Sequence, residues 1–334
     1  MSLKTRKIEV QAFAETFRGA ARIVEETLPD PGPGQVLVRN LYAGVNGFFD
    51  TCAVRNELPN VPLAPPFDAG VEAVGHVVAV GPGVTGLSAG DAVSTWRFGT
   101  GYREHQLADV GDVWKVREAS PAVVAIRPTG ISALVGLEQA GGLTSGEVVA
   151  VSAAAGGLGH FAAQIAKRAG NHVIGICGGA EKAALARRLG CDRVIDYHHE
   201  DVGEALSREY PRGVQLAFDS AGGAVLEAFV DNLAPRGRLV MSGWSSELGR
   251  GGKRSDHAGV LAKLYWKSAS VRGFQNPLYP EFRDEATRRL LDWHERGELT
   301  VLVDPTAFEG LDRVADAVEH LLSGRSRGKV VVRL

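Results

Sequence analysis

A glycine-rich turn between two apolar runs restricts the fold of this chain more than any other feature. Residues 148–151 are Val-Val-Ala-Val, and residues 153–159 fit the pattern Ala-x-x-Gly-x-x-Gly, with Gly157 as an additional glycine. Between a strand and a helix, such a turn lets the backbone approach a pyrophosphate closely and directs N–H groups at it. The pattern is not GxGxxG, so a tight turn whose small residues serve only packing is the alternative.

The sequence around this turn alternates between two patterns. Apolar runs predict strands at 148–152, 172–177, 193–196, 215–219 and 238–242. Helical patterns lie between them at 161–169, 181–189 and 225–233. This alternation produces βαβ units, in which a parallel sheet has helices on both faces. The sequence therefore predicts an α/β fold with a doubly wound parallel sheet, and this context favours dinucleotide binding at the turn.

The two ends of the chain have different patterns. Before the alternating region, short apolar runs at 35–41, 71–80 and 91–96 are separated by turns rich in Gly and Pro, as in a barrel-like β unit. After it, the sequence predicts a strand at 269–274, helices at 281–296 and 311–322, and a final strand at 329–333. A length of 334 residues is sufficient for two domains.

Composition excludes several classes of partner and location. The net charge is −2, which argues against nucleic acid and anionic membranes as partners. No apolar stretch is long enough to span a membrane, and the first residues do not resemble a secretory signal. The three cysteines, Cys52, Cys177 and Cys191, lie far apart, which argues against disulfides and a structural zinc site. We expect a cytoplasmic protein without a metal.

The end of the second predicted strand indicates which dinucleotide is bound. NAD-binding units carry an acidic residue there, which holds the ribose hydroxyls. This strand instead ends in Ile176-Cys177-Gly178-Gly179, and Lys182 follows. A lysine near the strand end, where no carboxylate is present, favours binding of a 2′-phosphate and hence NADP(H). The alternative is that Lys182 is simply an exposed residue at the start of a helix.

Several segments resemble the medium-chain dehydrogenases/reductases, and in particular their zinc-free quinone oxidoreductase branch. They are Gly44-Val45-Asn46, Pro66-Phe67-Asp68, the 153–159 turn, Gly190-Cys191-Asp192, Gly222-Gly223-Ala224 and 267–271. The resemblance implies a GroES-like β-barrel catalytic domain at 1–127, a Rossmann NADP-binding domain at 128–268, and a return at 269–334 that completes the catalytic domain. It also implies an active site between the domains and a homodimer formed through the edge of the Rossmann sheet.

The same resemblance implies that zinc is absent. Zinc-dependent relatives have a Cys ligand near the first barrel loop and a His ligand within Gly-His-Glu. Here these places are similar to Asn46 and to Gly70-Val71-Glu72, and neither Asn46 nor Val71 is a plausible zinc ligand.

The family pattern assigns roles to individual residues. Asn46 resembles the asparagine beside the nicotinamide, although a turn asparagine is the alternative. Asp50 is one position later than the family's aspartate, so no role is assigned to it. Ser132 resembles a hydroxyl that holds the carboxamide, or it starts a helix. Tyr197 and Lys182 resemble contacts to the 2′-phosphate. The remaining residues expected to contact the cofactor are Ala154, Gly156, Gly157, Leu158, Gly159, Gly178, Ser220, Ser242, Gly243, Phe274, Asn276 and Arg325.

The proton donor is less clear from the sequence. Tyr42 and Tyr102 are the candidates for protonating a reduced substrate, and water is the alternative. Trp244, Tyr265 and Trp266 either line a hydrophobic substrate pocket or belong to a core or an interface.

These features predict an NADPH-dependent, zinc-independent reductase of the C=C bond in α,β-unsaturated ketones and aldehydes. Its substrate would be a small hydrophobic carbonyl compound. Quinone reduction on the same scaffold is the alternative. A third hypothesis, from another class, is an NADP-binding redox sensor or interaction protein with little turnover.

Overall fold

The computed structural model describes residues 2–58, 61–248 and 259–334, and the chain forms two compact units. Unit 1 contains residues 1–128 and 303–334, and unit 2 contains residues 129–302. The first boundary is one residue later than expected. The expected division placed the return of the chain to unit 1 at residue 269, but the chain returns at Val303. Within the described ranges, no helix is long and apolar enough to cross a membrane.

Unit 2 is built on a six-stranded sheet in which all neighbouring strands are parallel. The order is β11-β10-β9-β12-β13-β14, so the chain direction across the sheet reverses beside β9. This is the position at which doubly wound sheets bind dinucleotides. The strands are β9 (Val148–Val151), β10 (His172–Cys177), β11 (Arg193–Asp196), β12 (Val214–Asp219), β13 (Leu233–Met241) and β14 (Ser270–Gly273). The predicted parallel sheet is confirmed.

Strand β14 explains the correction to the domain boundary. It pairs in parallel with β13, from Arg238 beside Ser270 to Met241 beside Gly273. Its hydrogen bonds therefore hold the chain in unit 2 after residue 269, and α10 (Arg283–Glu295) follows in the same unit. The ion pair between Arg289 and Glu138, at 2.6 Å, ties α10 to an earlier segment of unit 2.

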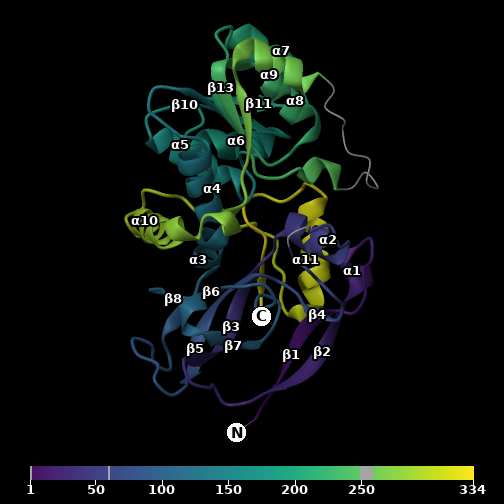
Figure 1. Cartoon of the computed structure of the whole chain (residues 1–334), viewed down its shortest axis with the longest axis vertical. Helices are drawn as coiled ribbons and strands as arrows, with labels where there is room; N and C mark the ends of the chain where they lie inside the picture. Colours follow the sequence, from purple (N-terminus) through teal and green to yellow (C-terminus); the bar gives the residue numbers. More distant parts are fainter. Residues whose placement is uncertain (1, 59–60, 249–258) are drawn as a thin grey trace. The chain divides into compact units, whose positions relative to one another are not determined.

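Helices α5 to α8 of unit 2 lie against strands of this sheet (Figure 1). The predicted helices are α5 (Gly159–Arg168), α6 (Ala180–Arg188) and α8 (Gly223–Asp231), and unit 2 also contains α4 (Ile131–Val135), α7 (Val202–Glu209) and α9 (Val260–Lys267). Leu206 of α7 and Phe229 of α8 lie in one buried cluster with Ile174 of β10. Helix α7 was not predicted; Asp201 caps it by accepting a hydrogen bond from Glu204 N–H at 2.8 Å.

Unit 1 contains two mainly antiparallel sheets. One has the order β2-β1-β4, and the other has the order β15-β3-β5-β6-β8, with β7 also paired to β3. The strands are β1 (Leu3–Val10), β2 (Ala21–Leu28), β3 (Gln35–Gly44), β4 (Phe67–Asp68), β5 (Glu72–Val80), β6 (Ala92–Trp96), β7 (His105–Asp109), β8 (Val113–Lys115) and β15 (Val331–Arg333). The helices are α1 (Phe17–Ala20), α2 (Gly47–Val54), α3 (Pro121–Ala125) and α11 (Val314–Leu322).

The C-terminal segment completes unit 1. Strand β15 pairs antiparallel with β3, and Val331 lies opposite Gly44. Val332 and Val314 are fully buried in one cluster with Val10 and Ala43 from the beginning of the chain. This pairing brings residue 329 beside the segment that follows β3, although 283 residues separate Lys329 from Asn46.

Candidate active site

The glycine turn has a geometry that only small residues allow. Ala153 adopts a left-handed conformation, with φ of 48°. A Cβ at Gly159 would overlap the Ala153 carbonyl oxygen, and a Cβ at Gly156 would lie 3.1 Å from it. Helix α5 begins at Gly159 without a side-chain cap. The turn at 156–159 thus places a helix N-terminus where an anionic pyrophosphate fits.

Two further residues shape this turn. His160 is fully buried, and its Nε2 accepts a hydrogen bond from Leu302 N–H at 3.1 Å. Its Nδ1 therefore carries the proton and donates to the Gly156 carbonyl at 2.8 Å. Ala154 is also buried and donates its N–H to the Ile176 carbonyl. The structure therefore gives Ala154, which we expected to contact the cofactor, a role in the shape of the turn.

The end of β10 forms a second polar region. The Tyr197 ring lies where a side chain at position 178 would be, 2.5 Å from a Cβ built on Gly178, so only glycine fits beside it. The aromatic residue is half exposed, and Lys182 lies in the first turn of α6. Asp196, which no local pattern marks as a site residue, accepts a hydrogen bond from Gly179 N–H at 2.8 Å. Hydrogen bonds from Gly179 and His198 lower the pKa of this carboxyl group. The neighbouring strand thus places a carboxylate where β10 itself has none.

The other expected cofactor contacts of unit 2 follow the remaining strands. Ser220 follows β12, and its N–H donates to Ser152 Oγ at 2.9 Å. Ser242 and Gly243 follow β13, and a Cβ on Gly243 would lie 3.2 Å from the Ser220 carbonyl oxygen. Because the strands are parallel, their carboxyl ends meet at one edge of the sheet. The turn at 156–159, Gly178 and these residues therefore share that edge.

Ser132 and Asn276 come together although 144 residues separate them. Asn276 Nδ2 donates to Ser132 Oγ at 2.8 Å, and Phe274 packs in a buried position shortly after β14. Ser132 is the second residue of α4 and does not cap that helix. The structure thus does not support the alternative of a helix-capping serine, and the expected contact of the Ser132 hydroxyl with the nicotinamide carboxamide stays a prediction.

In unit 1, Asn46 belongs to a buried polar cluster. Lys329 Nζ lies 2.7 Å from Asn46 Oδ1 and 2.7 Å from Glu72 Oε1. Lys329 is only 2% exposed and Glu72 is fully buried. Burial raises the pKa of the Glu72 carboxyl, and the charge of Lys329 opposes this shift. Asn46 is the residue before α2, but its side chain does not cap the helix and faces Lys329 instead.

Asp50 holds the Asn46 segment from the other side. Its Oδ2 accepts hydrogen bonds from Asn46 N–H at 3.1 Å and from the Tyr102 hydroxyl at 2.6 Å. Burial raises the pKa of Asp50 to about 7. Tyr102 is 1% exposed, and burial together with Asp50 raises its pKa well above the usual value. The burial of Tyr102 and its hydrogen bond to Asp50 argue against the expected role as proton donor, which stays a prediction.

Tyr42 and Arg325 lie in unit 1 as well. Tyr42 is half-buried on β3, opposite Val74 and Arg333. Arg325 is exposed, and its Nε donates to Ser323 Oγ at 3.0 Å. Neither position joins the cluster of Asn46, Lys329 and Glu72, so their expected roles stay predictions.

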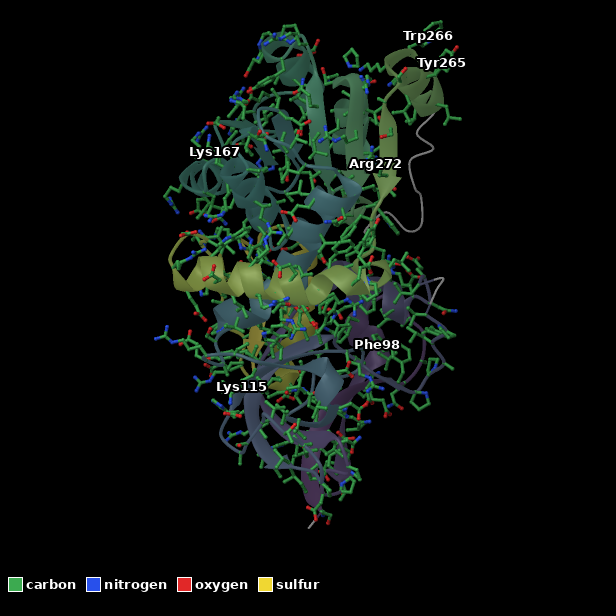
Figure 2. The ribbon with its side chains drawn as sticks, turned by 60° about the vertical axis from the view of Figure 1, so that its left-hand side comes forward. Phe98, Lys115, Lys167, Tyr265, Trp266 and Arg272 are labelled. Atoms are coloured by element: carbon green, nitrogen blue, oxygen red, sulfur yellow. The ribbon has the colours of Figure 1, made fainter. Side chains whose placement is uncertain are left out.

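The aromatic residues of α9 face solvent. Figure 2 shows Tyr265 and Trp266 projecting away from the ribbon, and they are 75% and 83% exposed. Their exposure agrees better with an interface than with a core. Across the described ranges, no three His, Cys, Asp or Glu side chains gather as a metal site would require.

Three residues of the candidate site could not have been found from local sequence. Lys329 stands at the start of the expected final strand at 329–333, where nothing in the local sequence indicates that it is buried beside Glu72. His160 accepts a hydrogen bond from Leu302, which lies 142 residues away in the sequence. Asp196 lies on a neighbouring strand and accepts a hydrogen bond from Gly179. Glycine at position 44 is a weak signal of the buried Glu72, because a Cβ there would overlap Glu72 Oε1.

Comparisons with known proteins agree with this geometry. A model described as "Alcohol dehydrogenase GroES-like domain" matches residues 32–118, and one described as "Zinc-binding dehydrogenase" matches residues 157–292. The expected GroES-like and Rossmann parts are thereby confirmed. Prostaglandin reductase-3 of Bos taurus is 40% identical over 99% of this chain and 90% of its own length. A probable quinone oxidoreductase of Leishmania amazonensis is 35% identical over 98% of both chains. The structure of Escherichia coli quinone oxidoreductase complexed with NADPH has a TM-score of 0.85, at 27% identity, over 98% of this chain and 100% of that one.

Proposed function

This chain is a member of the medium-chain dehydrogenase/reductase superfamily, and we propose that it reduces the C=C bond of α,β-unsaturated ketones and aldehydes with NADPH. One observation carries the proposal. Where zinc-dependent relatives have metal ligands, this chain has Asn46 and Val71, and the buried Lys329 contacts Asn46 and Glu72. Such a site has hydrogen-bond donors and a positive charge, which suit an acceptor that is already activated.

The described residues of unit 2 fit NADPH, which supplies a hydride when it is bound. The turn at 156–159 would hold the pyrophosphate, because its helix N-terminus has no side-chain cap. Lys182 and Tyr197 would contact the 2′-phosphate. Ser132 and Asn276 would hold the nicotinamide carboxamide through their joined polar groups.

The chain's own residues then stabilise the charge that develops on the substrate. As the β-carbon gains a hydride, the π electrons move to the carbonyl oxygen. The Asn46 amide would donate a hydrogen bond to this oxygen, and the positive charge of Lys329 would favour its negative charge. The α-carbon then takes a proton from water, since the proton of Tyr102 is held by Asp50.

Four phenylalanines of unit 1 support an apolar substrate. Phe49 of α2 and Phe98 have ring centroids 5.7 Å apart, Phe98 and Phe67 are 5.8 Å apart, and Phe67 and Phe13 are 6.3 Å apart. Each is at least partly exposed, and Phe98 is marked in Figure 2. Neighbouring rings that are partly open to solvent favour a surface that binds apolar groups. We therefore expect an enone with an alkyl or aromatic chain to react faster than a short polar one.

The test is NADPH oxidation with a medium-chain enone and, separately, a simple quinone, followed by product analysis. The expected result is a saturated ketone formed with NADPH and much more slowly with NADH. Lys182→Ala should raise the Kd for NADPH about fivefold or more and leave the Kd for NADH unchanged, since a single phosphate contact contributes about 1 kcal/mol or more. Quinone turnover without enone turnover would replace this proposal by quinone reduction, which the similarity to quinone oxidoreductases also favours. NADPH binding without turnover of either would favour the sensor hypothesis.

We also propose a homodimer formed through unit 2. Strand β14 lies at the edge of the sheet, and the exposed apolar side chains of Leu261, Tyr265, Trp266 and Val271 lie on α9 and β14. An unpaired strand edge beside exposed aromatic groups favours pairing with a second copy. Light scattering should give twice the mass of the chain, and Trp266→Glu should shift the protein toward monomer. The cytoplasmic location stays a prediction of the sequence.

A further inference from the structure

We infer that Lys329 is a positioning residue, whose ammonium group orients the Asn46 carboxamide and supplies the positive charge of the active site. This inference rests on the proposed reduction of a conjugated carbonyl. Lys329 itself would not contact the substrate. It would act through Asn46, to which it donates a hydrogen bond at 2.7 Å.

The contacts define the orientation of Asn46. Because Lys329 Nζ donates to Asn46 Oδ1, the oxygen of the carboxamide faces the lysine. Among the described residues, Asn46 Nδ2 makes no direct hydrogen bond within normal limits of distance and angle, although the Asn46 side chain also interacts with the Glu72 carboxylate and lowers its pKa. The amide is thus held between Lys329 and Glu72, and a ligand that supplies an acceptor at better geometry would complete the hydrogen bonding of Nδ2. A carbonyl oxygen of the substrate or of the nicotinamide carboxamide has the required chemistry.

Adjacent strands hold the lysine in place. Residue 329 lies two positions before β15. Strand β15 pairs with β3, and β3 pairs with β5, where Glu72 lies. Gly44 leaves room for Glu72, because a Cβ at position 44 would overlap the carboxylate. Glu72 thus serves to retain the ammonium group beside Asn46, and the strand pairing prevents Lys329 from moving toward solvent.

Stability alone does not account for this buried ion pair. Replacing a buried ion pair by neutral residues of similar volume is often neutral or stabilising, whereas removing one partner is strongly destabilising. A single Lys329→Met variant would therefore confuse lost positioning with an unpaired Glu72. The double variant Lys329→Met/Glu72→Gln removes both charges and separates the two effects.

The matched control is another ion pair with both partners mostly buried. Arg238 and Glu147 lie 2.6 Å apart in unit 2, with side chains 12% and 15% exposed, and neither belongs to the proposed site. Arg238→Met/Glu147→Gln should leave kcat for enone reduction and the Kd for NADPH within about twofold of the wild type. Any general effect of removing an ion pair would appear in this control as well.

The measurements are kcat and KM for enone reduction, the Kd for NADPH from fluorescence, and the melting temperature. Lys329→Met/Glu72→Gln should fold, bind NADPH with a Kd within about threefold of the wild type, and lose at least tenfold in kcat. A kcat within twofold of the wild type would overturn the inference, because Lys329 would then only neutralise Glu72. A tenfold higher Kd for NADPH with unchanged kcat would also overturn it and assign Lys329 to the cofactor.

Two further arms make the result decisive. If the double variant does not fold, Lys329→Arg is measured instead, because arginine retains the charge but changes the geometry of the hydrogen-bond donor. This variant should have a lower kcat and an unchanged melting temperature. An unchanged kcat would refute the positioning role of Lys329. If the wild type reduces neither an enone nor a quinone, the proposed function is refuted. Crystal structures of the wild type and the double variant then test the inference about Lys329. An Asn46 carboxamide that keeps its orientation in the double variant would overturn it, and a rotated one would support it.

Discussion

Asp50 should make the free energy of unfolding fall as the pH rises from about 4 to about 7. The buried carboxyl group has its pKa raised from 3.8 to about 7, with burial as the main cause. Between these values the folded protein holds a proton that the unfolded chain has released. Because the folded state then binds more protons, stability decreases with rising pH across this window and is constant above it.

The magnitude follows from the size of the shift. A shift of about 3 pKa units corresponds to about 4 kcal/mol over the whole window, at 1.36 kcal/mol for each unit. Between pH 5 and pH 8 the Asp50 contribution to stability should fall by about 2.5 kcal/mol. Tyr102 and Asn46 hydrogen-bond to this carboxylate, and the nearby charges of Lys329 and Glu72 act on its pKa in opposite directions.

The assay is urea unfolding at pH 5 and pH 8 for the wild type and Asp50→Asn. Asparagine can accept the same hydrogen bonds but does not titrate, and Glu72 titrates in both proteins, so the difference isolates Asp50. The wild type should lose about 2.5 kcal/mol more than the variant. Asp91→Asn is the control, because hydrogen bonds from Lys115 and Ser88 lower the pKa of the partly buried Asp91, which stays ionised throughout this range. Equal losses in the wild type and Asp50→Asn would refute the reasoning.

Three other substitutions test the remaining interpretations. Gly159→Ala should cost about 1–3 kcal/mol of stability in urea unfolding and raise the Kd for NADPH at least tenfold, because its Cβ would overlap the Ala153 carbonyl oxygen; Gly156→Ala, with a Cβ 3.1 Å away, should cost less. Tyr102→Phe should lower stability by about 1–3 kcal/mol through the lost hydrogen bond to Asp50 and leave kcat within about threefold, whereas a hundredfold loss of kcat would restore Tyr102 as proton donor. Asp196→Asn keeps an acceptor for Gly179 but removes a negative charge beside the expected phosphate, so fluorescence titration should show a lower Kd for NADPH and an unchanged one for NADH.

Local patterns in the sequence were sufficient for the doubly wound sheet. Strands β10 and β11 have the predicted bounds, because apolar runs between turn residues leave little choice of register. The glycine turn was also predictable, since Gly156 and Gly159 are required by close approaches within a few residues of one another. The family resemblance then identified Asn46, Ser132 and Asn276 as candidates.

The limits of the sequence appear where distant segments meet. The return to unit 1 at Val303 depends on β14 pairing with β13, which no local pattern of residues 269–302 indicates. Helix α7 has few apolar residues, and it is stabilised by contacts of Leu206 in the core. Pairing between strands is set by the whole sheet, so local periodicity does not determine it.

The cluster of Asn46, Lys329 and Glu72 shows most clearly what the sequence predicts and what depends on the tertiary structure. The sequence by itself predicted a dinucleotide-binding turn and a β-rich first unit in one chain, and the family resemblance placed Asn46 where zinc-dependent relatives have a metal ligand. Only the tertiary structure decided that Lys329 lies buried against Asn46 and Glu72, and that Tyr102 donates to Asp50 in the interior. The physical reason is that the charge state and the donor direction of a polar group depend on burial and on its partners. Strand pairing supplies those partners from positions far apart in the chain.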